Sequence, residues 1–340
     1  PVDGRTFVAY GCALAAENSA DKPVTGEALL KQIESAETNH TVIADKPLFG
    51  YQEEYDRFRE RHAQNDVVHG DLHTYQGNAY LGVDAGSTTT KVALIGEDNS
   101  LLYSFYETNK GQPLECVKRA LETLYQKKNP NLKICGSAVT GYGEEMLKAG
   151  LGIDFGIVET VAHFRAAEFF CPDVDFIIDI GGQDIKAISI DENGAVKNFL
   201  MNDKCAAGTG RFLEMMARTL GLSLEEMSTK GLEWKENIVI SSMCTVFAES
   251  EVVSLVAQNK DVADIIHGLN VSVASKVGAL AARLGKKNPG EYMMTGGVAK
   301  NPGIIKALEE KLDAKLYICD EAQLCGALGA ALFAYEKCSV

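Results

Sequence analysis

The sequence predicts an α/β protein built from a duplicated unit, and two observations carry this prediction. Three strands followed by a helix and a further strand occur twice along the chain, with additional helices inserted. In both copies a glycine-rich turn that follows an aspartate joins the first two strands, at 84–91 and 179–186. The chain has 340 residues, 46% hydrophobic and 24% charged, which suits a folded protein long enough for two domains.

The first copy begins at Ala79, where polar sequence changes abruptly to strand-like sequence. Short runs rich in aliphatic and aromatic residues, bounded by turn residues, predict strands. The expected elements are strands at 80–83, 91–95 and 101–107, a helix at about 113–127 and a strand at 133–139.

The second copy has the same order of elements but longer helical insertions. Three strands at 176–180, 185–190 and 197–201 precede helical patterns at about 210–220, 246–257 and 261–284. A strand at 292–295, a helix at 302–312, a strand at 315–318 and a helix at 322–335 complete this copy.

The residues before Ala79 differ from the rest of the chain. Residues 18–78 are polar and carry charge runs, so we expect a linker or helical extension there without a catalytic constellation. Residues 1–17 are interpreted as the last helix of a preceding repeat, and chance similarity between two alanine-rich helices is the alternative. In this alignment Ala9, Gly11, Ala13, Leu14 and Ala16 match Ala327, Gly329, Ala331, Leu332 and Ala334.

Charge and hydropathy exclude several partners. The net charge of −14 argues against nucleic acid, because an acidic surface repels phosphate. No apolar run reaches the roughly 18 residues that span a bilayer. No signal peptide is recognised, so we expect a cytoplasmic protein that is not bound to a membrane.

Nine cysteines occur without a CxxC pair, which argues against a secreted disulfide framework and against a zinc ribbon. Five of them lie in or beside apolar segments, where a free cysteine behaves as a small hydrophobe. These five are Cys116, Cys135, Cys171, Cys319 and Cys325.

The first glycine-rich turn has the residues of a phosphate-binding site. Gly86 permits close backbone approach to an anion, and the hydroxyl and amide groups that follow it are hydrogen-bond donors. Asp84, at a strand end, could hold the water shell of Mg²⁺. The candidate binding residues are Gly86, Ser87, Thr88, Thr89 and Lys91, although a lysine in a strand is usually solvated.

Two further turns extend the site. Gly181 and Gly182 follow Asp179 in the second copy, and Gln183 and Asp184 stand where they could orient a water molecule. In the third turn Gly296 and Gly297 would let a purine or ribose lie against bare backbone, and Asn301-Pro302 suits a helix start. Any one of these turns alone could be ordinary. The P-loop pattern is absent, as is a GxGxxG that opens a helix after a strand.

Two cysteines stand apart from the other seven. Cys205 lies in Lys204-Cys-Ala-Ala-Gly-Thr-Gly-Arg-Phe212 and Cys244 in Ser241-Ser-Met-Cys-Thr-Val-Phe-Ala-Glu249, and each precedes a helical pattern. A helix N-terminus stabilises a thiolate. Burial of both thiols in the core is the alternative, with Gly208, Thr209 and Gly210 forming another nucleotide contact.

The three turns resemble the phosphate and adenosine motifs of the actin/hexokinase/Hsp70 ATPase superfamily, which has a two-lobed ribonuclease H-like fold. The Cys205 segment closely resembles the activator ATPases of 2-hydroxyacyl-CoA dehydratases and the related ATPase subunits of benzoyl-CoA reductases. The resemblance covers about 79–335, with lobe I at about 79–175 plus helix 322–335 and lobe II at about 176–318.

The resemblance implies an ATPase coupled to electron transfer. It implies a homodimer with one [4Fe-4S] cluster, to which each subunit contributes Cys205 and Cys244. Thiolates suit such a cluster, and two cysteines per chain favour a shared two-fold site. The implied partner is a dehydratase or related cluster protein, and the implied electron donor is reduced ferredoxin or flavodoxin.

Roles at the nucleotide follow from the same resemblance. Asp84, Asp179 and Gln183 are the expected catalytic residues, with ATP or ADP and Mg²⁺ as cofactors. The remaining glycine-turn residues and Asn301 are the expected binding residues. Two other functions stay open: a small-molecule kinase of the same superfamily, which would need a base aimed at a substrate hydroxyl, and a nucleotide-binding interaction module without redox chemistry.

Overall fold

The computed structural model describes residues 6–17, 25–31, 49–63, 66–240, 244–285 and 290–339. The chain divides into two units, Pro1–Ile43 and Ala44–Val340. Parts of the predicted 18–78 extension, and Ser241–Met243 before Cys244, lie outside the described residues.

The smaller unit contains α1 (Phe7–Glu17) and a short helix at 26–31. The apolar side chains of α1 are exposed: Phe7 is 61%, Val8 80% and Tyr10 63% accessible. Gly11 has open space around it. The described side chains of α1 are therefore exposed rather than part of a core.

The larger unit holds two five-stranded sheets of the same topology, as the duplicated pattern predicted. The first has the order β3-β2-β1-β4-β5 and the second the order β10-β9-β6-β7-β8. The strands of the first are β1 (Gly77–Ala85), β2 (Thr89–Gly96), β3 (Leu101–Thr108), β4 (Leu132–Thr140) and β5 (Phe155–Gly156). Those of the second are β6 (Phe176–Ile180), β7 (Ile185–Ile190), β8 (Val196–Asn202), β9 (Tyr292–Thr295) and β10 (Leu316–Tyr317).

Strand register places the two aspartates in equivalent positions. β1 pairs antiparallel with β2, which puts Asp84 opposite Lys91. β6 pairs antiparallel with β7, which puts Asp179 opposite Lys186. β1 and β6 also pair in parallel with β4 and β9, so each is the central strand of its sheet.

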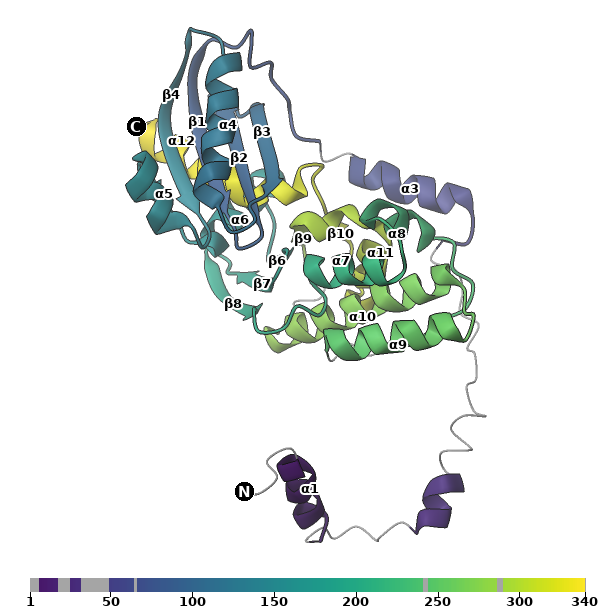
Figure 1. The fold of residues 1–340 in the computed structure, drawn as a ribbon. Coiled ribbons are helices and arrows are strands. Elements are labelled where there is room, and N and C mark those ends of the chain that lie inside the picture. Colours follow the sequence, from purple (N-terminus) through teal and green to yellow (C-terminus); the bar gives the residue numbers. More distant parts are fainter. Residues whose placement is uncertain are drawn as a thin grey trace. The chain divides into compact units, whose positions relative to one another are not determined.

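Helices cover both sheets (Figure 1). In the first copy these are α4 (Pro113–Lys127), α5 (Glu144–Leu151) and α6 (Glu159–Phe170). In the second they are α7 (Gly210–Thr219), α8 (Leu224–Lys230), α9 (Thr245–Ala257), α10 (Val262–Arg283), α11 (Pro302–Leu312) and α12 (Cys325–Cys338). Sequence analysis did not predict α5, α6 or α8.

The last helix of each copy packs on the sheet of the other. α12 contacts β1, β2 and β4, whereas α6 contacts β6 and β8, and the two helices also contact each other. Small residues make this possible: a Cβ at Gly82 would fall on the carbonyl of Ala327, and one at Gly329 on the carbonyl of Ala162. The crossing helices thus form the joint between the two sheets.

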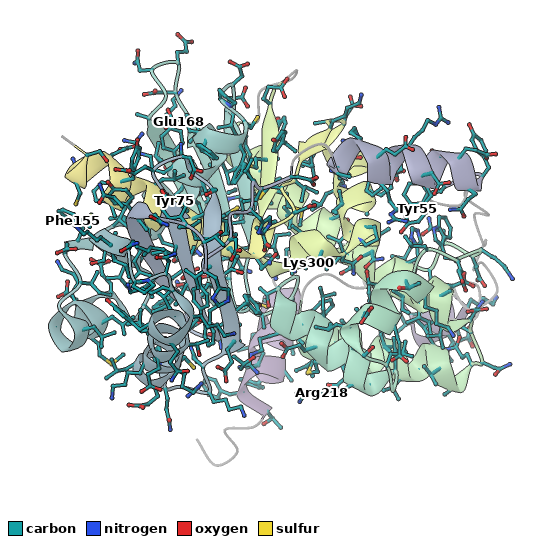
Figure 2. The ribbon with its side chains drawn as sticks, turned by 90° about the horizontal axis from the view of Figure 1, so that it is seen from above. Tyr55, Tyr75, Phe155, Glu168, Arg218 and Lys300 are labelled. Atoms are coloured by element: carbon teal, nitrogen blue, oxygen red, sulfur yellow. The ribbon has the colours of Figure 1, made fainter. Side chains whose placement is uncertain are left out.

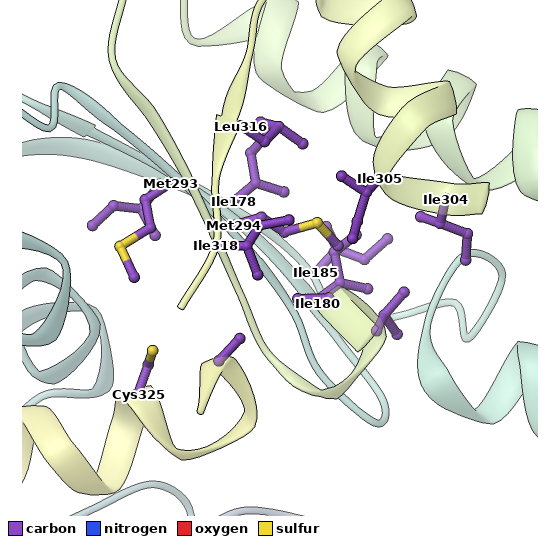
Figure 3. Close-up of a cluster of buried hydrophobic side chains, with 14 of the residues drawn as sticks. Ile178, Ile180, Ile185, Met293, Met294, Ile304, Ile305, Leu316, Ile318 and Cys325 are labelled. Atoms are coloured by element: carbon purple, nitrogen blue, oxygen red, sulfur yellow. The ribbon is translucent and has the colours of Figure 1, made fainter. Parts of the chain in front are cut away.

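Alternation along the strands assigns their side chains to two cores. Leu81 and Val83 face α4, while Tyr80 belongs to the larger core shared with α12. Figure 3 shows that core in the second lobe, where side chains of β6, β7, β9 and α11 meet. Of the five cysteines expected in apolar surroundings, Cys116, Cys171, Cys319 and Cys325 are buried, but Cys135 on β4 is exposed.

One helix is long and apolar enough to cross a membrane by length and composition alone, although polar and charged residues interrupt its apolar sequence. It is α10, with a mean hydropathy of 1.3 over its best window. Of that window 72% is buried, and α10 packs against α11 and α8. Its apolar residues therefore belong to the protein core.

Candidate functional site

A cavity of about 610 Å³ between the two sheets brings all three glycine-rich turns together. The sequence-predicted residues that line it are Asp84, Gly86, Ser87, Thr88, Thr89, Lys91, Asp179, Gly181, Gly182, Gln183, Gly210, Gly296, Gly297 and Asn301. Gly208, Thr209, Cys205 and Cys244 are not in its wall. The first and second turns face each other, because a Cβ at Gly182 would lie 3.0 Å from the Cβ of Thr88.

The first turn is closed by the amide of Gly86, which donates to the carbonyl of Thr89 at 3.0 Å. Asp84 is 2% exposed, and its Oδ2 accepts from Lys91 Nζ at 2.8 Å. Its Oδ1 has no hydrogen-bond partner among the described residues. Burial would lower the pKa of Lys91, but the Asp84 carboxylate outweighs it and the pKa is raised.

The second turn repeats this geometry with a denser charge network. The amide of Gly181 donates to the carbonyl of Asp184 at 3.0 Å. Lys186 is 3% exposed and its Nζ lies 3.5 Å from Asp179, 3.0 Å from Asp184 and 3.0 Å from Glu159. The expectation that strand lysines are solvated is therefore wrong for Lys186, since three carboxylates surround it.

Glu159 and His163 of α6 belong to this network, and sequence analysis did not identify them. Thr295 Oγ1 donates to Asp179 Oδ1 at 3.0 Å and lies 3.1 Å from His163 Nδ1. Burial would raise the pKa of Asp179, but His163 and Lys186 outweigh it and lower that pKa. Burial raises the pKa of Glu159. No motif marked these residues, because α6 buries side chains on several faces and lacks a clear apolar stripe.

Ligand atoms of Glu159, His163 and Asp179 lie within 4.8 Å of one another, a spacing that could hold a metal ion. Lys186 already supplies a positive charge to two of these three side chains. Asp84 Oδ1, unpartnered within the described chain and in the cavity wall, is the better candidate for a divalent cation and its water shell.

The third turn requires glycine. Gly296 has φ +91°, and a Cβ there would meet the carbonyl of Ile180. Asn301 caps α11, since its Oδ1 accepts from the amide of Ile304 at 3.2 Å. Asn301 therefore has a structural role as well as a place in the cavity wall.

Cys205 and Cys244 come together at the start of α9. Cys244 is the N-cap of α9 and makes no side-chain capping bond. Burial would raise the pKa of Cys205, but the amide of Ala207, the Lys276 ammonium and the amide of Thr245 outweigh it and lower that pKa. Thr245 is the first residue of α9, so the two thiols lie at the same helix N-terminus.

Lys276 of α10 is a further residue that sequence analysis missed. A Cβ at Gly208, which has φ +89°, would lie 3.4 Å from its Cδ. Its ammonium also interacts with the Cys205 thiol. No sequence signal marked it, because it lies more than 70 positions from Cys205 in an ordinary helical pattern (276 − 205 = 71).

The cysteine segment is bonded directly to the second turn. The amides of Gly210 and Arg211 donate to the carbonyls of Gly181 and Gly182, both at 2.9 Å. Gly210 begins α7, five positions after Cys205 (210 − 205). A displacement of the second turn would therefore reach the cysteine segment through two backbone hydrogen bonds.

An apolar surface adjoins the cysteines on α9. Val246 is 63%, Phe247 64%, Val253 53% and Val256 47% exposed. Val246 and Phe247 closely follow Cys244, whereas Val253 and Val256 lie more than two turns beyond Cys244 along α9. We call these four residues the α9 patch.

Two sheets of identical strand order around one cavity are the architecture of the actin/hexokinase-like ATPase fold. Residues 81–334 match the BadF/BadG/BcrA/BcrD ATPase family, and the chain belongs to it. It is 40% identical over 259 residues to the 2-hydroxyisocaproyl-CoA dehydratase activator of Clostridioides difficile, covering 76% of this chain and 95% of that one. It is 42% identical over 260 residues to the (R)-2-hydroxyglutaryl-CoA dehydratase activating ATPase of Acidaminococcus fermentans, covering 76% and 97%.

Solved structures agree with this assignment. The Clostridium difficile activator of 2-hydroxyisocaproyl-CoA dehydratase with bound ADPNP superposes with a TM-score of 0.71 at 39% identity, covering 77% of this chain and 96% of that one. The ethanolamine utilization protein EutJ of Carboxydothermus hydrogenoformans, at 15% identity and a TM-score of 0.53, covers 77% and 92% and shares the fold.

Proposed function

We propose that this chain is an ATP-dependent activator that donates one electron, through a [4Fe-4S] cluster, to a 2-hydroxyacyl-CoA dehydratase or related acyl-CoA reductase. One observation carries the proposal. The segment that holds Cys205 is hydrogen-bonded through Gly210 and Arg211 to the turn expected to bind phosphate. About 40% identity to named dehydratase activators supports the same function.

ATP would lie with its phosphates between the first and second turns and its adenosine along the third. Backbone amides and hydroxyls at 86–89 would donate to phosphate oxygens, and Gly181 and Gly182 leave room for them. Mg²⁺ would be held near Asp84, whose free Oδ1 fits it, and near Asp179. Gln183 would orient the attacking water.

The cluster fits the cysteine pair. Amide donors and a nearby lysine suit a thiolate ligand with negative charge. When bound, the cluster supplies the one-electron chemistry. One chain offers two cysteines at this place, so a second copy would supply the other two, and the α9 patch is the surface a homodimer would cover.

Nucleotide state would control the cysteine segment through the second turn. Loss of the γ-phosphate would shift Gly181 and Gly182, and their bonds to α7 would carry the shift to Cys205. The crossed helices α6 and α12 would be the hinge between the lobes. We further propose a cytoplasmic protein that takes its electron from reduced ferredoxin or flavodoxin.

The test is anaerobic iron–sulfur reconstitution of the full chain. We expect about four iron ions and four sulfide ions per dimer, and an absorbance band at about 400 nm. Cys205→Ala and Cys244→Ala should each lose the cluster, while the exposed Cys135→Ala should keep it. Wild-type protein that stays colourless and monomeric would contradict the proposal.

A further inference from the structure

We propose that α3 (Gln52–Ala63), which lies outside the family-matched residues 81–334, is part of the nucleotide site, and that Tyr55 packs against the base of the bound nucleotide. This inference rests on the proposed ATP binding. It assigns a binding role to a segment in which sequence analysis expected no functional residue.

Tyr55 is in the wall of the cavity that holds the three glycine-rich turns. It shares that wall with Ser228 and Thr229 of α8, and with Lys300 and Pro302 of the third turn. Figure 2 shows Tyr55 on α3, on the side that faces the helices of the second lobe, and Lys300 nearer the middle of the view. Tyr55 thus lies 26 positions before the first residue of the matched family region (81 − 55 = 26).

An ion pair fixes α3 on the second lobe. Arg61 Nη2 donates to both carboxylate oxygens of Glu309, at 2.7 and 2.8 Å, and its Nη1 donates to the carbonyl of Leu316 at 3.4 Å. Glu309 lies on α11, the helix that begins directly after the third turn. These contacts join two guanidinium nitrogens to two different acceptors of the second lobe, so α3 is oriented relative to that turn.

Aromatic packing completes the attachment of α3. Phe58 is 9% exposed, and its ring packs edge-on against the Phe49 ring, with the two ring centroids 5.2 Å apart. Phe49 also meets the Tyr55 ring at 5.1 Å and packs with Trp234 and Ala263. The Tyr55 side chain is therefore held by neighbours on its own segment, and Tyr55 is part of the cavity wall.

The place of Tyr55 in the cavity favours a contact with the base of the nucleotide over a contact with its phosphates. Asp84 and Asp179, at the ends of β1 and β6, mark the phosphate end. Tyr55 belongs to a helix anchored on α11, at the end built by the third turn and α8. An aromatic ring stacks on a purine face and provides no charge for phosphate, so its contribution is to the base.

The experiment measures dissociation constants of the full chain for ADP and for pyrophosphate, which lacks the base. We expect Tyr55→Ala to raise the dissociation constant for ADP about tenfold, because stacking on one aromatic ring is of that size. Tyr55→Phe keeps the ring and should stay within about twofold. Pyrophosphate affinity should be the same in all variants.

Two further variants serve as a control and as a replacement in this test. Tyr51→Ala removes an exposed tyrosine just before α3 that is not in the cavity wall, and it should bind ADP as wild type does. Tyr55→Leu retains bulk without the aromatic face and replaces Tyr55→Ala if that variant fails to fold. Unchanged ADP affinity in Tyr55→Ala or Tyr55→Leu overturns the inference and leaves the proposed function intact. Wild-type chain that binds neither ADP nor ATP overturns both.

Discussion

At the scale of single residues, the site depends on two aspartate–lysine pairs related by the duplication. Asp84 faces Lys91 and Asp179 faces Lys186 in equivalent registers. The sequence places each aspartate at a strand end beside a glycine turn, but it does not show that Lys186 is buried and Lys91 partly buried. Tertiary packing decides this, because Lys186 meets Glu159 of α6 and Lys91 lies in the cavity wall.

Replacing Lys186 by Met should destabilise the protein strongly. Lys186 faces Asp179, Asp184 and Glu159, and its loss removes the ammonium that these three carboxylates share. We expect a loss of about 3–5 kcal/mol in the free energy of unfolding, measured with urea at neutral pH. Lys133→Met, at an exposed strand position, should change it by less than about 0.5 kcal/mol. Equal stability of the two variants would show that the network is not what holds this turn.

At the scale of elements, strands were easier to predict than helices. Each predicted strand is present, because alternation and turn residues mark strands locally. The helix α6 was not predicted because its side chains are buried on several faces and form no single apolar stripe. Glu159 and His163 belong to this helix, so they were not predicted either. α3 could be predicted as a helical piece, but its place beside the cavity depends on Arg61 and Glu309, 248 positions apart.

Docking of α3 should weaken in mild acid. Burial, and then the charge of Arg61, lower the pKa of His62 from 6.5 to about 4. Its ring also lies 3.9 Å from Glu309 and packs edge-on against Phe58. Because the undocked histidine protonates below about pH 6.5 and the docked one does not, the stabilisation is complete above pH 6.5 and is lost as the pH falls toward 4.

Hydrogen exchange of the α3 amides, corrected for intrinsic rates, measures this effect. When the pH falls from 7.5 to 5.5, we expect the free energy of opening of α3 to decrease by about 1 kcal/mol. This value allows for the partial exposure of the His62 side chain. His62→Leu should remove the pH dependence, whereas His73→Leu, at an exposed position, should retain it. Protection that does not change with pH in wild-type protein would contradict this assignment.

At the scale of the whole molecule, the cavity belongs to neither lobe alone. Its walls come from turns about 95 residues apart (179 − 84) and from α3. A ligand that bridges both lobes should therefore stabilise the whole larger unit against unfolding.

Thermal unfolding with a non-hydrolysable ATP analogue tests this bridging. At 100 times its dissociation constant, the analogue with Mg²⁺ should add about 2.7 kcal/mol to the free energy of unfolding. The analogue with Mg²⁺ should therefore raise the melting temperature, and chelation of Mg²⁺ should make this rise smaller. The Asp84→Asn variant should show a smaller rise than wild type even when Mg²⁺ is present. If the analogue with Mg²⁺ raises the melting temperature of Asp84→Asn as much as that of wild type, Asp84 does not hold the metal ion.

The domain boundaries remain a proposal drawn from the repeated pattern. We propose that α1 is the last helix of a preceding copy of the ATPase domain. Gly329, Ala331 and Ala334 of α12 are buried against a sheet and α6, whereas the aligned Gly11 and Ala13 of α1 are exposed. The complete reading frame that encodes this chain would show whether such a copy precedes it.

The sequence by itself determined the duplicated α/β fold and the three glycine-rich turns, and it made Cys205 and Cys244 the candidate cluster ligands that we propose. These features are local, since turn chemistry, strand alternation and small-residue stripes depend on near neighbours in the chain. Only the tertiary structure decided that Lys186 is buried, that Lys276 meets Cys205 and that Tyr55 borders the cavity. Each of these depends on residues that are distant in sequence, and their side chains meet only when the sheets and helices pack together.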